Sequence, residues 1–357
     1  MQKDSKLRKV WAIAKPGSLA NLRLEDEILS PPPAHHVQVK VRAIGLNFAD
    51  IFAILGLYSA TPKERFIPGF EVAGIVEAVG AGEEQSQWLG QRVYCTTRFG
   101  GYANYINADV RYVKITPDSW TDQEACAFTG QGMTAFYALR ELGNLYTQYK
   151  NPRQKTVLVH SAAGGVGLLA LAILAKASAK VVGTVGNPSK LELLDSKYGD
   201  NPNFKFILRS PARDFESRGR DALHAVDPDA DGFDIVLDSI MGDWFWPNHN
   251  LLNKAGRHIV FGSASFTPSQ TALSIMEWLK LAWKSLWKPV LDPMCLIKSN
   301  KSVLGFNLIH IYDQDDVLNS IFDDLNGLRL DPPHVGHELS FENAHEAISL
   351  LQSGKTI

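Results

Sequence analysis

The order of apolar and polar positions divides the chain into two parts. Over residues 10–113, short apolar or alternating runs lie between turn residues, with alternation at 38–43 and an apolar run at 72–79. Runs with a period of two that are bounded by turns are typical of β-strands. The pattern predicts a β-rich first domain, followed by a helix over residues 121–141 and a polar stretch at 144–155.

After residue 155, apolar segments of strand length alternate with segments of helical spacing. The predicted strands are residues 156–160, 180–185, 204–208, 234–238, 257–261 and 302–306. Such alternation is typical of a doubly wound sheet of parallel strands with helices on both faces. The sequence therefore predicts an α/β second half. One further helix is expected over residues 342–352, after Pro332 and Pro333.

A glycine-rich loop follows the first of these strands and precedes an apolar helix predicted over residues 168–177. The loop consists of Ala162, Ala163, Gly164, Gly165, Val166 and Gly167. Glycines let a pyrophosphate approach the backbone, and the helix N-terminus offers unpaired amide donors. We interpret residues 163–167 as the phosphate-binding loop of a dinucleotide cofactor. The alternative is a tight turn that binds nothing.

The residues beyond the second strand indicate which dinucleotide binds. Sites for NAD carry an acidic residue about 20 positions after the glycines, where it binds the ribose hydroxyls. This chain has no acid there; Thr184, Ser189 and Lys190 occupy the region, and Arg209 closes the third strand. Because cations and hydroxyls attract a 2′-phosphate, we expect NADPH rather than NADH. The alternative for Lys190 is an ordinary solvated lysine.

The overall composition limits the kind of partner. The chain has 357 residues and is 45% hydrophobic, which suits about two packed domains. Its 36 basic and 38 acidic residues give a formal net charge of −2, so no basic surface for nucleic acid is expected. Three scattered cysteines suit a reducing compartment, and the N-terminus lacks the apolar core of a secretory signal. We expect a cytoplasmic protein without a transmembrane helix, acting on a small molecule.

Several motifs, in their order along the chain, resemble the medium-chain dehydrogenase/reductase superfamily. They are residues 45–50 (GLNFAD), 56–58 (GLY), 68–74 (PGFEVAG), the loop at 162–167 and residues 236–238 (VLD). Within the superfamily the chain is most similar to the zinc-free quinone oxidoreductase branch, and there to the vesicle amine transport protein group. The resemblance implies an α/β protein with a GroES-like catalytic domain at residues 1–128 and 313–357, and a Rossmann dinucleotide-binding domain at residues 129–312.

Two positions argue against a catalytic zinc. Zinc alcohol dehydrogenases of the superfamily carry a cysteine at the position of Asn47, and a histidine at that of Phe70. An amide and a phenyl ring cannot replace the thiolate and imidazole ligands. Cys126 lies near a third ligand position, and we interpret it as a small buried apolar residue, with a reactive thiol as the alternative. A quinone or an α,β-unsaturated carbonyl (an enone or alkenal) spreads the charge of hydride addition over several atoms, so such acceptors are the implied substrates.

By resemblance, residues from both domains meet at the cofactor. Asn47 and Asp50 are expected at its nicotinamide end, and Tyr58 is the candidate hydroxyl beside the substrate carbonyl, with simple packing as its alternative. Further cofactor contacts are expected from Thr134 on the interdomain helix, from Ser263 after the fifth strand, and from Phe306 and Asn307 after the sixth. For Ser263 and Asn307 the alternative is an ordinary turn residue.

Residues 271–290 form a predicted helix of unusual composition. Apolar residues recur at helical spacing beside a second stripe of lysines and tryptophans: Lys280, Lys284, Lys288, Trp278, Trp283 and Trp287. This composition also occurs on helices that lie on membranes; the alternative is that the tryptophans roof the substrate cleft. A membrane- or partner-binding protein that retains the cofactor fold as a scaffold is therefore a second hypothesis. The resemblance also implies a homodimer joined through the strand at 302–306.

Overall fold

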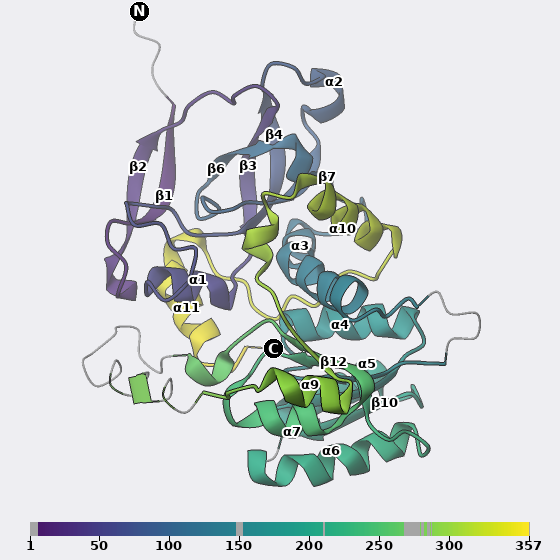
Figure 1. The fold of residues 1–357 in the computed structure, drawn as a ribbon. Helices are drawn as coiled ribbons and strands as arrows, with labels where there is room; N and C mark the ends of the chain where they lie inside the picture. Colours follow the sequence, from purple (N-terminus) through teal and green to yellow (C-terminus); the bar gives the residue numbers. More distant parts are fainter. Residues whose placement is uncertain are drawn as a thin grey trace, which may run out of the picture.

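The molecule has two lobes, which Figure 1 shows one above the other. The computed structural model describes residues 6–147, 153–209, 211–267, 279, 282, 283, 286 and 288–356. One lobe is built of antiparallel strands, and the other is a sheet with helices on both faces. The long helix α3 (Asp122–Tyr137) lies between them.

The first lobe is the β-rich domain that the sequence predicts. β1 (Leu7–Ile13) pairs antiparallel with β2 (Leu22–Ile28), and a separate antiparallel sheet has the strand order β6-β3-β4-β5-β7. Its strands are β3 (His36–Ile44), β4 (Glu71–Val79), β5 (Arg92–Thr96), β6 (Tyr105–Asp109) and β7 (Val113–Ile115). Two short helices, α1 (Phe48–Ile54) and α2 (Gln85–Trp88), join these strands. Apolar side chains that alternate along the strands form the core of the sheet.

The second lobe contains the predicted doubly wound parallel sheet, with the strand order β10-β9-β8-β11-β12-β13. Its strands are β8 (Thr156–Val159), β9 (Lys180–Val185), β10 (Phe204–Leu208), β11 (Phe233–Asp238), β12 (Leu252–Val260) and β13 (Ser302–Gly305). Its helices are α4 (Gly165–Lys176), α5 (Ser189–Tyr198), α6 (Ala212–Val226), α7 (Phe245–Asn250) and α9 (Pro293–Ser299). The strand order reverses between β8 and β11. Ligands of open α/β sheets bind beyond the carboxyl ends of the strands at such a point.

Three element boundaries differ from those predicted by three residues or more. α4 begins at Gly165 rather than at residue 168, because the first amides of a helix need no intrahelical acceptor and glycine is tolerated there. β12 begins at Leu252 rather than at residue 257, since polar residues at its start conceal the strand pattern. The helix predicted over 121–141 is α-helical only to Tyr137 and then continues as a π-helical turn, Ala138–Leu142.

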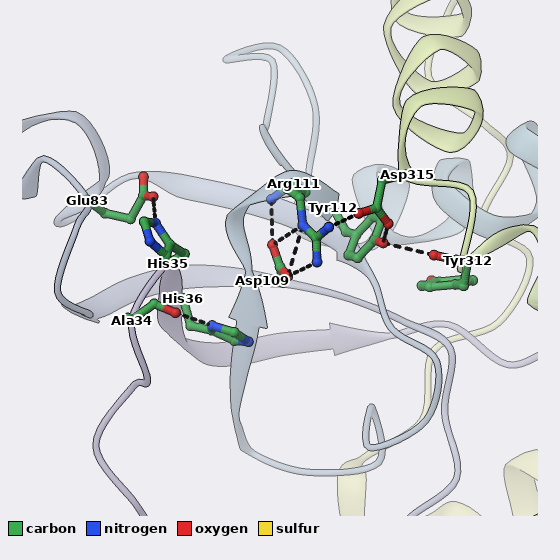
Figure 2. Close-up of polar contacts among 9 residues, drawn as sticks. All are labelled: Ala34, His35, His36, Glu83, Asp109, Arg111, Tyr112, Tyr312 and Asp315. Carbon is green, nitrogen blue, oxygen red and sulfur yellow. Dashed lines mark hydrogen bonds and ion pairs between the residues drawn. The ribbon is translucent and has the colours of Figure 1, made fainter.

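The C-terminal part of the chain returns to the β-rich lobe. Helix α10 (Asp315–Gly327) begins at an acid that pairs with Arg111 and accepts a 2.6 Å hydrogen bond from the Tyr112 hydroxyl (Figure 2). The last helix, α11 (Ala344–Gln352), lies beside α1. The boundaries at residues 128/129 and 312/313 stay a prediction, and α3 runs across the first of them.

Most of the helix predicted at 271–290 lies outside the described residues. The described ones among them include Leu279, Ala282, Trp283 and Leu286, whose backbone is helical. In the described part of the chain, no helix is long and apolar enough to cross a membrane.

Candidate active site

The glycine-rich loop lies at the carboxyl end of β8, beside the point where the strand order reverses. Ser161 enters it with a φ of 51°, and the Gly164 amide donates back to the Ser161 carbonyl over 2.8 Å. A Cβ on Gly167 would lie 2.3 Å from that same carbonyl oxygen, so only glycine fits there. The loop thus delivers the backbone directly into the first turn of α4, where free amides and the helix dipole favour an anion.

Gln131 of α3, the helix between the two lobes, covers this loop. A Cβ placed on Gly165 would lie only 1.6 Å from the Gln131 side-chain oxygen, so the side chain rests directly on that glycine. A phosphate bound at Gly165 must therefore displace Gln131 or share its position. The sequence analysis assigned Gln131 no role. The sequence feature that could have indicated a role for Gln131 is its position three residues before Thr134, because this spacing places both side chains on one face of the helix.

Lys190 and Arg209 lie next to each other beyond the ends of β9 and β10. Lys190 Nζ donates to the Gly354 carbonyl over 3.0 Å, and the Arg209 guanidinium lies over the Trp244 ring at 5.4 Å. Burial lowers the pKa of both groups, and the charge of Arg209 lowers that of Lys190 further. Among the described residues neither cation has a carboxylate within ion-pair distance, and Arg209 Nη1 is buried without a hydrogen-bond partner. The two charges are therefore arranged to accept an anion.

The other residues predicted around the loop differ in their exposure. Gly164, Gly165 and Val166 are partly exposed, and Ser189 is fully on the surface. Ala163 and Thr184 are buried, and the Thr184 hydroxyl is 2.8 Å from His160 Nδ1. Contact of these two with a ligand is limited to the backbone.

A buried polar network, which the sequence pattern does not reveal, lies beneath the loop. Asp238, at the end of β11, is 2.9 Å from His258 of β12, and both side chains are inaccessible to solvent. The other Asp238 oxygen accepts 2.8 Å hydrogen bonds from the amides of Ile240 and Met241, and Asn248 connects Asp238 to His160. Hydrogen bonds from His258 and these amides outweigh burial and hold the pKa of Asp238 well below its usual range. The network fixes the strand ends on which the loop rests.

The predicted nicotinamide end is built around two buried carboxylates. The Asn47 amide nitrogen Nδ2 donates to Glu71 Oε1 over 2.7 Å, and the Asn47 backbone amide donates to Asp50 Oδ2 over 2.8 Å. The second Asp50 oxygen accepts from the Gly69 amide, so this residue joins two loops. Burial raises the pKa of Asp50 to about 8 and that of Glu71 to about 7.

Tyr58 of the first lobe contacts the second lobe directly. Its hydroxyl donates to Asn307 Oδ1 over 2.7 Å, so two of the predicted site residues meet although 249 positions separate them. Burial raises the pKa of Tyr58 to about 12, so the hydroxyl keeps its proton at neutral pH. Its ring packs edge-on against Phe70, 5.9 Å between centroids, which makes this wall of the site apolar.

The remaining candidates occupy the second lobe and α3. The Thr134 hydroxyl donates to the Gly130 carbonyl over 2.7 Å, and Phe306 packs against Tyr137 with 4.9 Å between ring centroids. Ser263 is partly exposed after β12. Cys126 is 2% exposed, which confirms its interpretation as a buried residue.

Two cavities lie apart from most of these residues. One, of about 770 Å³, is lined by parts of the β-rich lobe and the start of α10, among them Thr96, Arg98, Arg111 and Tyr312. The other, of about 400 Å³, is lined by Gln131, Gly165 and residues of α4 and of 330–334. Only the second touches the glycine-rich loop.

Comparison with known proteins connects these features to a family. Residues 33–139 match the alcohol dehydrogenase GroES-like domain. The chain is 30% identical over 310 residues to the synaptic vesicle membrane protein VAT-1 homolog-like of Mus musculus, covering 86% of this chain and 68% of that protein. The chain also resembles two solved structures, each 25% identical in sequence. The first is mycobacterial Rv1454c complexed with NADPH, with a TM-score of 0.75 and 98% of both chains covered. The second is the CurK enoyl reductase, with a TM-score of 0.74 and 98% of this chain and 96% of the other covered. The chain belongs to the zinc-independent quinone oxidoreductase branch of the medium-chain dehydrogenase/reductase superfamily, near the VAT-1 homologues.

Proposed function

We propose that the protein is an NADPH-dependent oxidoreductase that passes hydride to quinones or α,β-unsaturated carbonyls without zinc. The observation that carries this proposal is the pair Lys190 and Arg209, two neighbouring cations beyond the ends of β9 and β10 that have no carboxylate within ion-pair distance among the described residues. Support comes from relatives described as an enoyl reductase and as an NADPH complex.

The residues around the loop fit such a cofactor. The unpaired buried nitrogen of Arg209 and the Lys190 ammonium suit a 2′-phosphate, with Ser189 at its edge. The backbone of the loop would hold the diphosphate. The full set that we propose for cofactor binding is Thr134, Ala163, Gly164, Gly165, Val166, Gly167, Thr184, Ser189, Lys190, Arg209, Ser263, Phe306 and Asn307.

The chemistry needs little from the protein beyond orientation. When bound, NADPH supplies the hydride. Asn47 orients the reacting groups by hydrogen bonding, while Asp50 orders the loops around it. Tyr58 would exchange its hydrogen bond to Asn307 for one to the carbonyl oxygen of the acceptor, whose conjugation spreads the incoming charge, and solvent would complete the protonation. The apolar wall of Phe70 and Phe99 favours a hydrophobic acceptor.

The direct test follows NADPH oxidation spectroscopically with quinones, enones and alkenals, and repeats it with NADH. We expect turnover with at least one acceptor class and a clear preference for NADPH. Tight NADPH binding without turnover of any acceptor would favour the scaffold hypothesis instead.

Tyr58→Phe is expected to lower turnover about tenfold, because the variant loses the hydroxyl but keeps the packing against Phe70. The reduction is modest since water can still protonate the product. Steady-state rates of the variant and the wild type provide the measurement, and Tyr146→Phe, at a half-exposed tyrosine, is the matched control. An unchanged rate assigns Tyr58 to packing alone.

Exposed apolar side chains favour membrane contact as a second candidate function. Leu279, Trp283 and Leu286 are each more than 60% exposed and recur at helical spacing. We expect the protein to float with anionic liposomes. The double variant Trp283→Ala/Leu286→Ala should reduce the bound fraction several-fold, and absence of wild-type binding would leave the tryptophans as a roof over the cleft.

A cytoplasmic location and a homodimer through β13, an edge strand of its sheet, also stay proposals.

A further inference from the structure

We propose that Glu71 is a positioning residue, which fixes the Asn47 amide and ties it to Thr134 of α3. The proposal rests on the proposed function, because it assigns Asn47 and Thr134 to the nicotinamide end. Its basis is a continuous chain of short contacts. Asn47 Nδ2 donates to Glu71 Oε1 over 2.7 Å, the Gly130 amide donates to Glu71 Oε2 over 2.6 Å, and the Gly130 carbonyl accepts from the Thr134 hydroxyl.

The Glu71 carboxylate has only one place to lie. Its side chain is inaccessible to solvent. A Cβ on Gly45 would come within 2.2 Å of Oε1, and a Cβ on Gly130 within 2.8 Å of Oε2. Two glycines from different segments therefore form a slot around it, and each oxygen faces an N–H donor. A buried carboxylate in such a slot is a rigid acceptor of two hydrogen bonds.

This arrangement determines how the Asn47 amide is presented. Since Glu71 accepts from Nδ2, the nitrogen end of the amide is fixed toward the carboxylate and cannot exchange places with the oxygen. An amide nitrogen carries two protons, and within the described residues no acceptor for the second one is found. Asn47 is only partly buried, so this proton is available to a ligand carbonyl or hydroxyl. Glu71 itself need not touch the ligand.

The charge of Glu71 matters as well as its shape. A glutamine would turn its amide group toward one of the two N–H donors and lose that hydrogen bond. Burial raises the pKa of Glu71 to about 7. The ionised carboxylate, which accepts both hydrogen bonds, therefore predominates above that pH and is lost as pH falls through it. The titratable groups that face Glu71 are Asp50, Tyr102, Cys126 and Tyr312; the pKa of each is raised, mainly by burial. Affinity at the nicotinamide end should therefore rise as pH increases through about 7.

The test compares NADPH with 2′,5′-ADP, which carries the 2′-phosphate but lacks the nicotinamide end. We expect Glu71→Gln to weaken NADPH about tenfold and to leave 2′,5′-ADP unchanged, which also shows that the second lobe is folded. The NADPH to 2′,5′-ADP affinity ratio should rise between about pH 6 and pH 8 in the wild type and rise less in the variant, in which Asp50 still titrates near the top of this range; the ratio cancels the titration of the 2′-phosphate itself. Glu77→Gln, a half-exposed glutamate on the same strand, is the matched control.

Two further variants keep the proposal falsifiable if Glu71→Gln folds poorly. Gly130→Ala places a methyl group against Oε2 and should reproduce the tenfold loss. Asn47→Ala should abolish the effect of Glu71→Gln in the double variant, because Glu71 acts through Asn47. Additive losses, or equal losses for both ligands, would overturn the positioning role. If the wild type binds neither ligand, the proposed function fails, and this inference is overturned with it.

Discussion

Asp238→Asn is expected to lower the free energy of unfolding by about 3–5 kcal/mol, because it leaves two of the buried donors around Asp238 without an acceptor, at about 1–3 kcal/mol each. The carboxylate is inaccessible to solvent and lies 2.9 Å from His258, which is equally buried. Asparagine has nearly the same shape, so the loss reports charge and hydrogen bonding rather than a cavity. The asparagine side chain has one acceptor oxygen in place of two, so either the two backbone amides or the His258 and Asn248 nitrogens lose their acceptor.

The expected loss has a structural consequence at the cofactor loop. Asp238 accepts from the amides of Ile240 and Met241, and Met241 has a φ of 59°. A residue in that conformation persists only when its surroundings hold it. The Ile240 carbonyl, just before Met241, accepts hydrogen bonds from the Ser265 amide and hydroxyl, near the predicted contact Ser263. We therefore expect cofactor affinity to fall together with stability.

Urea unfolding monitored by tryptophan fluorescence provides the measurement, and Asp313→Asn is the control. Asp313 pairs with Arg98 at 3.0 Å, but both side chains are more than half exposed, so its substitution should cost at most about 1 kcal/mol. The pH dependence adds a second check. Because the pKa of Asp238 is held below its unfolded value, its stabilisation is present above the unfolded pKa and is lost as pH falls through the folded one. Equal effects of the two substitutions would contradict this account.

Features that depend on neighbours along the chain could be predicted from the sequence. The strand before residues 162–167, the glycines and the apolar helix after them all lie within about two dozen positions, and the parallel sheet was predicted from local alternation of the same kind. The family motifs added the division into two domains and the pairing of Tyr58 with the cofactor lobe.

Features that depend on distant contacts were not predicted. His160 contacts Asn248, 88 positions away, and Glu71 accepts from Gly130, 59 positions away. In the sequence these are single polar residues in or beside apolar strands, a pattern that gives no partner. Gln131 was missed for the same reason, since only the packing of α3 on the loop places it against Gly165. Single polar residues within otherwise apolar strands are therefore the sequence signal that indicates a buried polar network.

Lys190→Ala/Arg209→Gln is expected to weaken NADPH binding about 100-fold and to leave NADH binding nearly unchanged. Each charge-assisted hydrogen bond to a phosphate contributes about 1.5–3 kcal/mol, so losing two accounts for at least this factor. NADH has no 2′-phosphate and gains nothing from either cation. Removing them also relieves the repulsion that, after burial, lowers the pKa of Lys190 in the free protein, whereas Arg209 gives up an attraction to Asp238, so the two electrostatic effects on stability oppose each other.

Titration of cofactor fluorescence gives both dissociation constants for each variant. Arg213→Gln, at the exposed start of α6 with 84% of its side chain accessible, removes one nearby positive charge without touching the proposed phosphate site and serves as the control. It should alter NADPH affinity less than twofold, because an exposed charge is screened by solvent and salt. Arg209 also packs on Trp244, so an equal loss for NADH and NADPH would assign the two residues to folding of the lobe. A loss confined to NADPH places the 2′-phosphate between Lys190 and Arg209, where the sequence lacks the acid that NAD requires.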